Sequence, residues 1–190
     1  MTYLNNNYGI VKFEKEQNYK ITDKSGIYKV VALPISFSSD NKKLVSEYLS
    51  FFKNFSMSSW EEKIDSSTSF KDSKIIVELN KSFEKDIINI FEKGIDWSKE
   101  EDNFDEVKKL VHFLPSLYIG KAKDQSLKTR FTQHLNYQKE DSLINRINKI
   151  ELFKKCYKLF IWIELEDEYI DSFESLLIQS SNPIFNIQRS

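Results

Sequence analysis

Cysteine, glycine and proline are scarce in this chain of 190 residues, which contains one Cys, four Gly and three Pro. The single cysteine, Cys156, excludes an internal disulfide bond. With only two histidines in the chain, it also excludes a structural zinc site built from clustered Cys and His. Because residues that interrupt helices are few, we expect a high helix content.

Long apolar runs are missing as well. No segment approaches the roughly 20 apolar residues that a membrane-spanning helix requires. The first residues, MTYLNNNYGIVKFEK, lack the apolar core of a signal peptide. We therefore expect a protein without membrane segments that acts in the reducing cytoplasm.

The charges are unevenly distributed along the chain, although the net charge is only −1. Residues 31–116 contain 12 lysines against 16 acidic residues, whereas residues 121–158 contain 10 basic against 4 acidic residues. Concentrated positive charge of this kind is typical of a surface that binds phosphates. It is equally typical of a solvated helical face, so charge alone leaves both interpretations open.

The apolar pattern predicts a mixture of strands and helices. Runs rich in β-branched and aromatic residues predict strands at 26–33, 73–79, 116–120 and 156–165. Apolar residues at helical spacing predict helices at 40–55, 82–94, 103–113, 126–137, 142–153 and 168–180. In the last helix, we expect the core to be contacted by Ile170, Phe173, Leu176 and Leu177.

Arg130 and His134 lie four residues apart on a predicted helix, and therefore on one stripe of it. The arginine fork suits phosphate oxygens, and a histidine with a pKa near 6.5 can accept or donate a proton. Taken alone, the pair is better explained by an exposed arginine and a histidine bonded to nearby backbone.

Three further features raise similar questions. Glu174 lies on the apolar side of its predicted helix, where a carboxylate must be paired, protonated or bound to a metal. Asn186 lies in the apolar segment PIFNIQ, where it either caps a loop or holds another group in place. The tripeptides Gly26-Ile27-Tyr28 and Tyr118-Ile119-Gly120 lie on predicted strands, and strand pairing would bring the two tyrosines close together.

The order of these features resembles the GIY-YIG nuclease family. The matching elements are Gly26-Ile27-Tyr28, Tyr118-Ile119-Gly120, Arg130-x-x-x-His134, Glu174 on a late helix and Pro183-x-x-Asn186. The resemblance implies an α+β fold in which a small three-stranded antiparallel sheet is flanked by helices. It places the nuclease core in residues 1–30 and 116–190.

The spacing of the two tripeptides departs from the family pattern. Most members have a short connection there, whereas Tyr28 and Tyr118 are 90 positions apart in this chain. Residues 31–115 therefore resemble a helix-rich, acidic insertion at the tip of a hairpin, where insertions are well tolerated. Restriction endonucleases of the family share the histidine four residues after the arginine, and they also carry insertions.

The resemblance implies a metal-dependent endonuclease that hydrolyses phosphodiester bonds in DNA, with a role in restriction or defence. The implied catalytic residues are Tyr28, Tyr118, Arg130, His134, Glu174 and Asn186. Glu174 would bind Mg²⁺ or Mn²⁺, and Lys121, Lys123 and Gly120 would contact phosphate. By resemblance Tyr28 is the general base, with its pKa lowered by nearby cations. Tyr118 and His134 would orient water or take over proton transfer, and Asn186 would hold Tyr28 or Glu174.

The sequence also allows two other interpretations. The chain can be an inactive relative that binds nucleic acid or a protein partner through its acidic insertion, or a structure-specific repair or mobile-element nuclease. The second of these needs a separate DNA-binding module, which the chain does not obviously contain. Because one site cuts one strand, cleavage of a duplex requires either a homodimer or two successive events.

Overall fold

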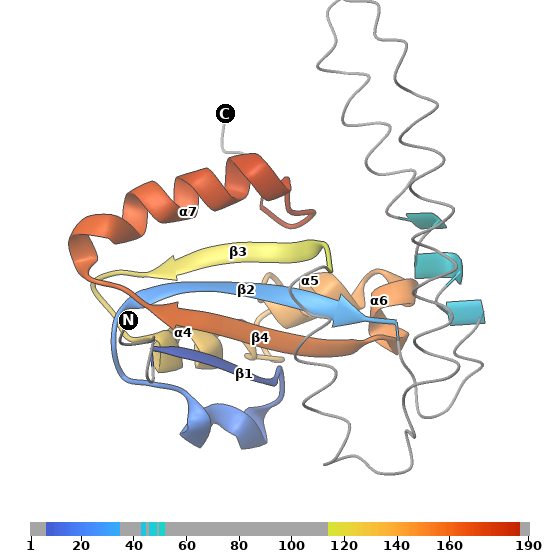
Figure 1. Ribbon diagram of the computed structural model, residues 1–190. Coiled ribbons are helices and arrows are strands. Elements are labelled where there is room, and N and C mark those ends of the chain that lie inside the picture. Colours follow the sequence, from blue (N-terminus) through green and yellow to red (C-terminus); the bar gives the residue numbers. More distant parts are fainter. Residues whose placement is uncertain (1–6, 35–42, 45, 49, 52–113, 187–190) are drawn as a thin grey trace, which may run out of the picture. The chain divides into compact units, whose positions relative to one another are not determined.

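The computed structural model describes residues 7–34, 43–44, 46–48, 50–51 and 114–186 (Figure 1). The chain divides into two compact units, one of Met1–Leu33 with Leu110–Ser190 and one of Pro34–Lys109. In the second unit, the described residues between 43 and 51 are helical. The strand predicted at 73–79 and the helices predicted at 82–94 and 103–113 lie outside the described residues.

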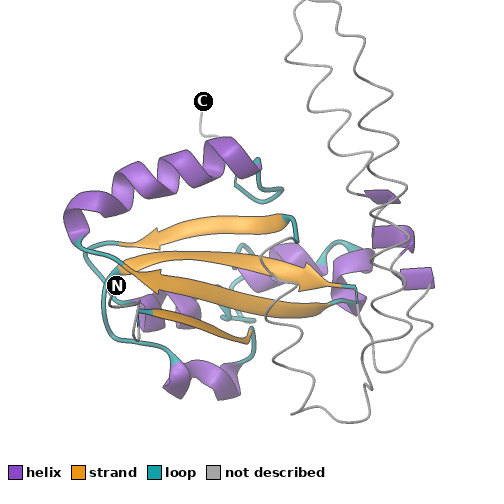
Figure 2. Ribbon diagram, in the orientation of Figure 1, coloured by secondary structure: helices purple, strands orange, loops and turns teal. Residues whose placement is uncertain are grey.

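A four-stranded antiparallel sheet forms the centre of the first unit, in the order β1-β4-β2-β3 (Figure 2). Its strands are β1 (Tyr8–Lys12), β2 (Gly26–Leu33), β3 (Ser116–Ala122) and β4 (Tyr157–Glu164). The predicted α+β class is confirmed, but the predicted number of three strands is wrong. The missed strand is β1, whose five residues are too few to show a clear alternation of apolar and polar side chains.

Helical segments pack around this sheet. They are the 3₁₀ helix η1 (Lys15–Lys20) and the α-helices α4 (Leu127–His134), α5 (Leu143–Asn148), α6 (Glu151–Lys155) and α7 (Asp167–Ser181). The prediction of a single helix at 142–153 is therefore wrong, because α5 and α6 are separate helices. Ile150 has extended backbone angles (φ −92°, ψ 111°), and this break between α5 and α6 allows Phe153 to be completely buried.

Aromatic side chains fill the space between the sheet and α4. The Phe160 ring stacks on Tyr28, with their centroids 4.9 Å apart, and meets the edge of Phe131 at 5.0 Å. Phe13, which follows β1, stacks on Phe160 from another side at 5.9 Å. Because side chains alternate between the faces of a strand, these contacts place α4 on the sheet face that carries Tyr28 and Phe160.

Helix α7 runs along β3 and contacts the sheet through only part of its surface (Figure 1). Ile170 is completely buried, as predicted, but Phe173 and Leu176 are 44% and 59% exposed. The prediction that these two residues face the core is wrong, because β3 is an edge strand and leaves the far side of α7 uncovered within the described residues. No helix in the described part of the chain is long and apolar enough to cross a membrane.

Phe160→Ala tests the packing of the sheet on α4. We expect the free energy of unfolding in urea to fall by about 3–5 kcal/mol, because the substitution leaves a cavity among the rings of Phe13, Tyr28, Phe131 and Trp162. Phe173→Ala is the matched control and should change it by less than about 0.5 kcal/mol, because its ring is exposed. Equal losses in both variants would contradict the assigned core.

Candidate active site

Three side chains from separate parts of the chain meet on the α4 side of the sheet. The Tyr28 hydroxyl lies 2.5 Å from Nε2 of His134. The Tyr118 ring lies 6.1 Å from the Tyr28 ring and 5.3 Å from the His134 ring, measured between centroids. The predicted proximity of the two tyrosines therefore holds, with the histidine packed against both.

Strand register explains why the tyrosines approach closely. Tyr28 lies directly opposite Gly120 in the β2–β3 ladder. A Cβ atom on Gly120 would lie 2.5 Å from the Tyr28 hydroxyl oxygen and 2.7 Å from the Tyr118 ring. Glycine is therefore required here because the side chains of both tyrosines occupy the space beside its Cα atom.

Helix α4 begins and packs in a way that directs Arg130 and His134 to one side. Ser126 caps its N-terminus, and the Ser126 hydroxyl accepts a hydrogen bond from the Thr129 amide at 3.1 Å. Leu127 and Phe131 are completely buried against the sheet. With these apolar residues fixed, the stripe of Arg130 and His134 lies at the edge of the packed face.

Burial controls the protonation of the Tyr28–His134 pair. Desolvation raises the pKa of Tyr28 well above its usual value of 10, and the neighbouring Tyr118 and Glu174 raise it further, although Arg130 lowers it. The expectation that cations lower the pKa of Tyr28 is therefore wrong for the protein alone. Desolvation, with Arg130 and Arg146 nearby, lowers the pKa of His134 from 6.5 to about 4. At neutral pH the tyrosine is thus protonated and the histidine is uncharged, so Nε2 can accept the hydroxyl proton.

Arg130 is held by two glutamines. Its Nη1 donates to Oε1 of Gln133 at 3.2 Å. When the Gln125 amide is oriented to satisfy both of its ends, its oxygen accepts from Nε of Arg130 at 2.9 Å. Both partners are neutral, so the positive charge of Arg130 is not cancelled by them and stays available to an anion.

Glu174 belongs to a network of charged residues between α7 and β3. Its Oε2 lies 2.9 Å from Nζ of Lys121. Asp171, one turn earlier on α7, pairs with Lys121 at 2.7 Å and with Lys123 at 2.5 Å. Hydrogen bonds from these two lysines lower the pKa of Asp171 to about 2. Asp171 is not among the site residues predicted from the sequence, although its position three residues before Glu174 places it near the same helix face.

Asn186 holds the backbone of β3. Its Oδ1 accepts from the Ile119 amide at 2.8 Å, and its Nδ2 donates to the Ile119 carbonyl at 2.6 Å. The adjacent Phe185 amide donates to the Leu117 carbonyl at 2.8 Å, and Arg146 donates to the Phe185 carbonyl. The expected contact of Asn186 with Tyr28 or Glu174 is therefore replaced by a contact with the residue between Tyr118 and Gly120.

The carboxylates of α7 suit a hard divalent cation. Mg²⁺ prefers oxygen ligands, keeps several waters and needs only one or two carboxylates from the protein. Mn²⁺ also accepts carboxylate and water ligands. The Glu174 side chain is 17% exposed and Asp171 is 52% exposed, so water can reach both. Within the described residues, no cluster of three or more His, Cys, Asp or Glu side chains forms a denser metal site.

Only some of the six predicted catalytic residues contact one another directly. Tyr28, Tyr118 and His134 are in contact, while Arg130 and Glu174 act on the Tyr28 hydroxyl through their charges.

Comparisons of the chain with protein-family models, with curated proteins and with solved structures found no match.

His134→Gln tests the partly buried histidine through the pH dependence of stability. Because the pKa of His134 is about 4 in the folded protein and about 6.5 when unfolded, the unfolded chain binds the proton more tightly. The free energy of unfolding of the wild type should therefore fall, relative to the variant, as the pH decreases from 6.5 to 4. The total difference is on the order of 3 kcal/mol. Parallel curves for the two proteins in urea titrations would contradict the partly buried, uncharged state.

Asn186→Ala tests the clamp on β3. Removing both hydrogen bonds to Ile119 should lower the free energy of unfolding by about 1–3 kcal/mol and speed hydrogen exchange of the Ile119 amide. Asn186→Asp keeps the acceptor for the Ile119 amide but replaces the donor by a carboxylate oxygen that faces the Ile119 carbonyl, so this variant should also lose stability. If exchange at Ile119 is as slow in Asn186→Ala as in the wild type, the clamp does not operate in solution.

Proposed function

We propose that this protein is a metal-dependent endonuclease of the GIY-YIG type, which hydrolyses phosphodiester bonds in DNA and acts in the cytoplasm in restriction or defence. The main support is the hydrogen bond between Tyr28 and His134, next to Tyr118 and under the influence of Arg130 and Glu174. Phosphodiester hydrolysis needs a proton acceptor, a cation for the phosphate and an aligned water, and these residues supply that combination.

Arg130 is the proposed ligand of the scissile phosphate. Its guanidinium group carries a fixed charge and is oriented by the neutral side chains Gln125 and Gln133. A planar fork of donors matches two phosphate oxygens. The attraction between the guanidinium group and the phosphate becomes stronger as negative charge builds up on the phosphate.

Lys121 and Lys123, near the end of β3, are paired with Asp171 and Glu174, so they would contact phosphate only after a metal ion engages these carboxylates. The side chains of Tyr28 and Tyr118 fill the space beside Gly120, so Gly120 contributes by leaving room for the two tyrosines.

Tyr28 and His134 form the proposed path of the proton. As the Tyr28 oxygen takes a proton from the attacking water, its own proton passes to Nε2 of His134, so the tyrosine never has to exist as a free phenolate. A negatively charged phosphate beside His134 favours the imidazolium form and raises its pKa from about 4 toward neutrality. Tyr118, packed against both rings, orients the water.

Glu174 is the proposed metal ligand, and Asp171 is close enough along α7 to assist it. A Mg²⁺ or Mn²⁺ ion held by these carboxylates would supply positive charge and would make water more acidic. Without the metal, Lys121 neutralises Glu174. The two carboxylates and two lysines therefore keep the α7 side of the site electrically balanced.

The same charge balance favours one alternative. A Glu174 carboxylate that is satisfied by Lys121 needs no metal, as expected of an inactive module that binds nucleic acid, or that binds a protein partner through the acidic residues 31–115. Such a module would shift DNA in a gel without cutting it. The enzyme and the binding module therefore differ in a single measurement.

Glu174→Gln distinguishes them. We expect the wild type to nick supercoiled plasmid DNA with Mg²⁺ and not with EDTA, and the variant to cut at least about 100-fold more slowly, since it lacks the charged ligand. Glu168→Gln is the matched control on the exposed side of α7 and should cut at the wild-type rate. Linear product without nicked DNA would indicate that two copies act together.

Failure of the wild type to cut DNA under any of these conditions, with retained binding, would support the inactive module. Cutting that is equal in Glu174→Gln and the wild type would contradict the proposed metal site.

A further inference from the structure

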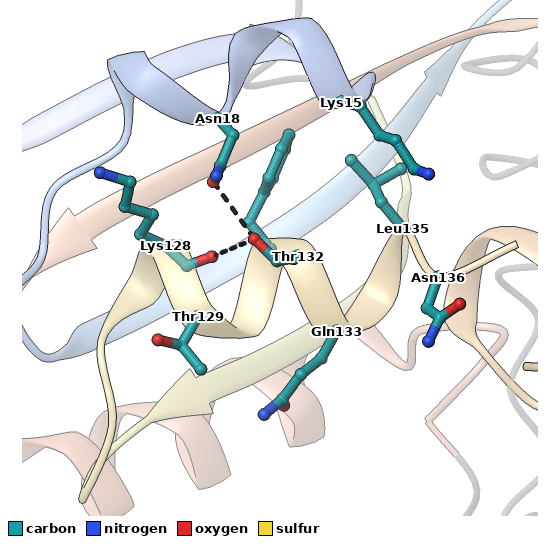
Figure 3. A pocket seen from close by; sticks show the side chains of 9 residues that line it. Lys15, Asn18, Lys128, Thr129, Thr132, Gln133, Leu135 and Asn136 are labelled. Carbon is teal, nitrogen blue, oxygen red and sulfur yellow. Dashed lines mark hydrogen bonds between the residues drawn. The ribbon is translucent and has the colours of Figure 1, made fainter.

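A second polar site lies beside the proposed active site, in a pocket between η1 and α4 (Figure 3). Its lining residues are Lys15, Asn18, Lys128, Thr129, Phe131, Thr132, Gln133, Leu135 and Asn136. Phe131 and Leu135 are buried and form an apolar floor, while most of the polar lining residues are exposed. The pocket is thus open to solvent and offers mainly polar groups to a ligand.

The composition of the lining favours an anion. It contains two ammonium groups together with hydroxyl and amide groups, and it contains no carboxylate. The Thr132 hydroxyl lies 3.0 Å from the Lys128 carbonyl oxygen and 3.3 Å from Oδ1 of Asn18, and it can donate its single proton to either of them. The contact with Thr132 therefore occupies one of these two oxygens at a time, while the amide nitrogen of Asn18 stays available as a donor to a phosphate. Lysines with neutral donors between them are a common arrangement at phosphate sites.

The two lysines are available to a ligand at opposite ends of the pocket, with Thr132 between them (Figure 3). Lys128 pairs with Asp23 at 3.6 Å, but the Asp23 side chain is 76% exposed, and surface pairs of this kind are weak. Lys15 lies over the Tyr137 ring at 5.8 Å from its centroid. The elongated spacing fits a chain of phosphates better than one compact ion.

Helix α4 connects this pocket to Arg130. Gln133 lines the pocket and also accepts the hydrogen bond from Arg130. Residues three or four apart on a helix are about 5–6 Å apart at Cβ. Phosphates of one DNA strand follow at about 3.4 Å of helix axis. Lys128 and Thr132 are each two residues from Arg130 and therefore project from a different side of α4. A strand that runs from Arg130 to the pocket has to cross the helix, and a helix diameter of about 10 Å corresponds to about three phosphates of one strand.

We propose that the pocket between η1 and α4 is a second phosphate site, where Lys15 and Lys128 bind the backbone of the DNA strand whose scissile phosphate lies at Arg130. This assignment rests on the proposed function. The assignment adds a binding site to the proposed nuclease and gives the DNA strand a direction across α4, from the active site toward η1.

The test compares two double variants of equal charge. Lys15→Ala/Lys128→Ala removes the pocket lysines, and Lys149→Ala/Lys154→Ala removes two lysines on or next to α5 and α6. DNA affinity is measured by fluorescence anisotropy in EDTA at several salt concentrations. Cleavage is then measured at saturating DNA with Mg²⁺, and circular dichroism verifies that both variants fold.

We expect the pocket variant to bind DNA about tenfold more weakly and to lower the slope of log affinity against log salt by one to two, because each lost phosphate contact contributes about 0.9. Its cleavage rate at saturating DNA should equal that of the wild type. The control variant should retain the wild-type slope.

Each of the other possible results would contradict a particular part of the proposal. Equal losses in both variants would overturn the pocket and leave only diffuse charge, while the proposed enzyme stands. Binding that depends on the pocket lysines without any cleavage would retain the pocket and overturn the enzyme. No DNA binding by the wild type would overturn both. Displacement of DNA by inorganic phosphate at the pocket lysines would assign a free-phosphate site instead of a strand site.

Discussion

The pairing of β2 with β3 is the constraint on which the proposed site depends. This register places Tyr28 opposite Gly120, and only glycine leaves room there for the Tyr28 hydroxyl and the Tyr118 ring. A shift of one residue would turn Tyr28 to the opposite face of the sheet and away from His134. The hydrogen bond between Tyr28 and His134 therefore reports on the register of the whole ladder.

Burial then determines what this pair can do. In water, a histidine with a pKa near 6.5 is partly protonated at neutral pH. A tyrosine with a pKa near 10 stays protonated there and is a poor base. Inside the aromatic cluster of Phe160, Phe131 and Tyr118, the uncharged forms of both groups are favoured. The resulting pair holds the Tyr28 proton against an uncharged His134, which can accept it once a nearby negative charge stabilises the imidazolium form.

The sequence predicted the features that follow from local pattern and missed those that depend on long-range packing. Gly26–Leu33 has the bounds predicted for its strand, because its β-branched and aromatic residues favour no other structure. The break at Ile150 and the exposure of Phe173 depend on which surfaces the sheet covers, and no local pattern records that. Asp171 and the clamp of Asn186 on Ile119 were missed for the same reason, since their partners lie about 50 or more residues away.

The clamp also bears on how a long connection between β2 and β3 is tolerated. About 80 residues separate these strands, and loop-closure entropy rises by about 0.6 kcal/mol for each doubling of length. Compared with a tight hairpin, the penalty is therefore only about 2–3 kcal/mol. On one side, β4 pairs with the full length of β2, and on the other, Asn186 and Phe185 bind the backbone of β3. Hydrogen bonds on both outer sides of the β2–β3 pair offset that entropy, so the register that sets Tyr28 against Gly120 does not require a short turn.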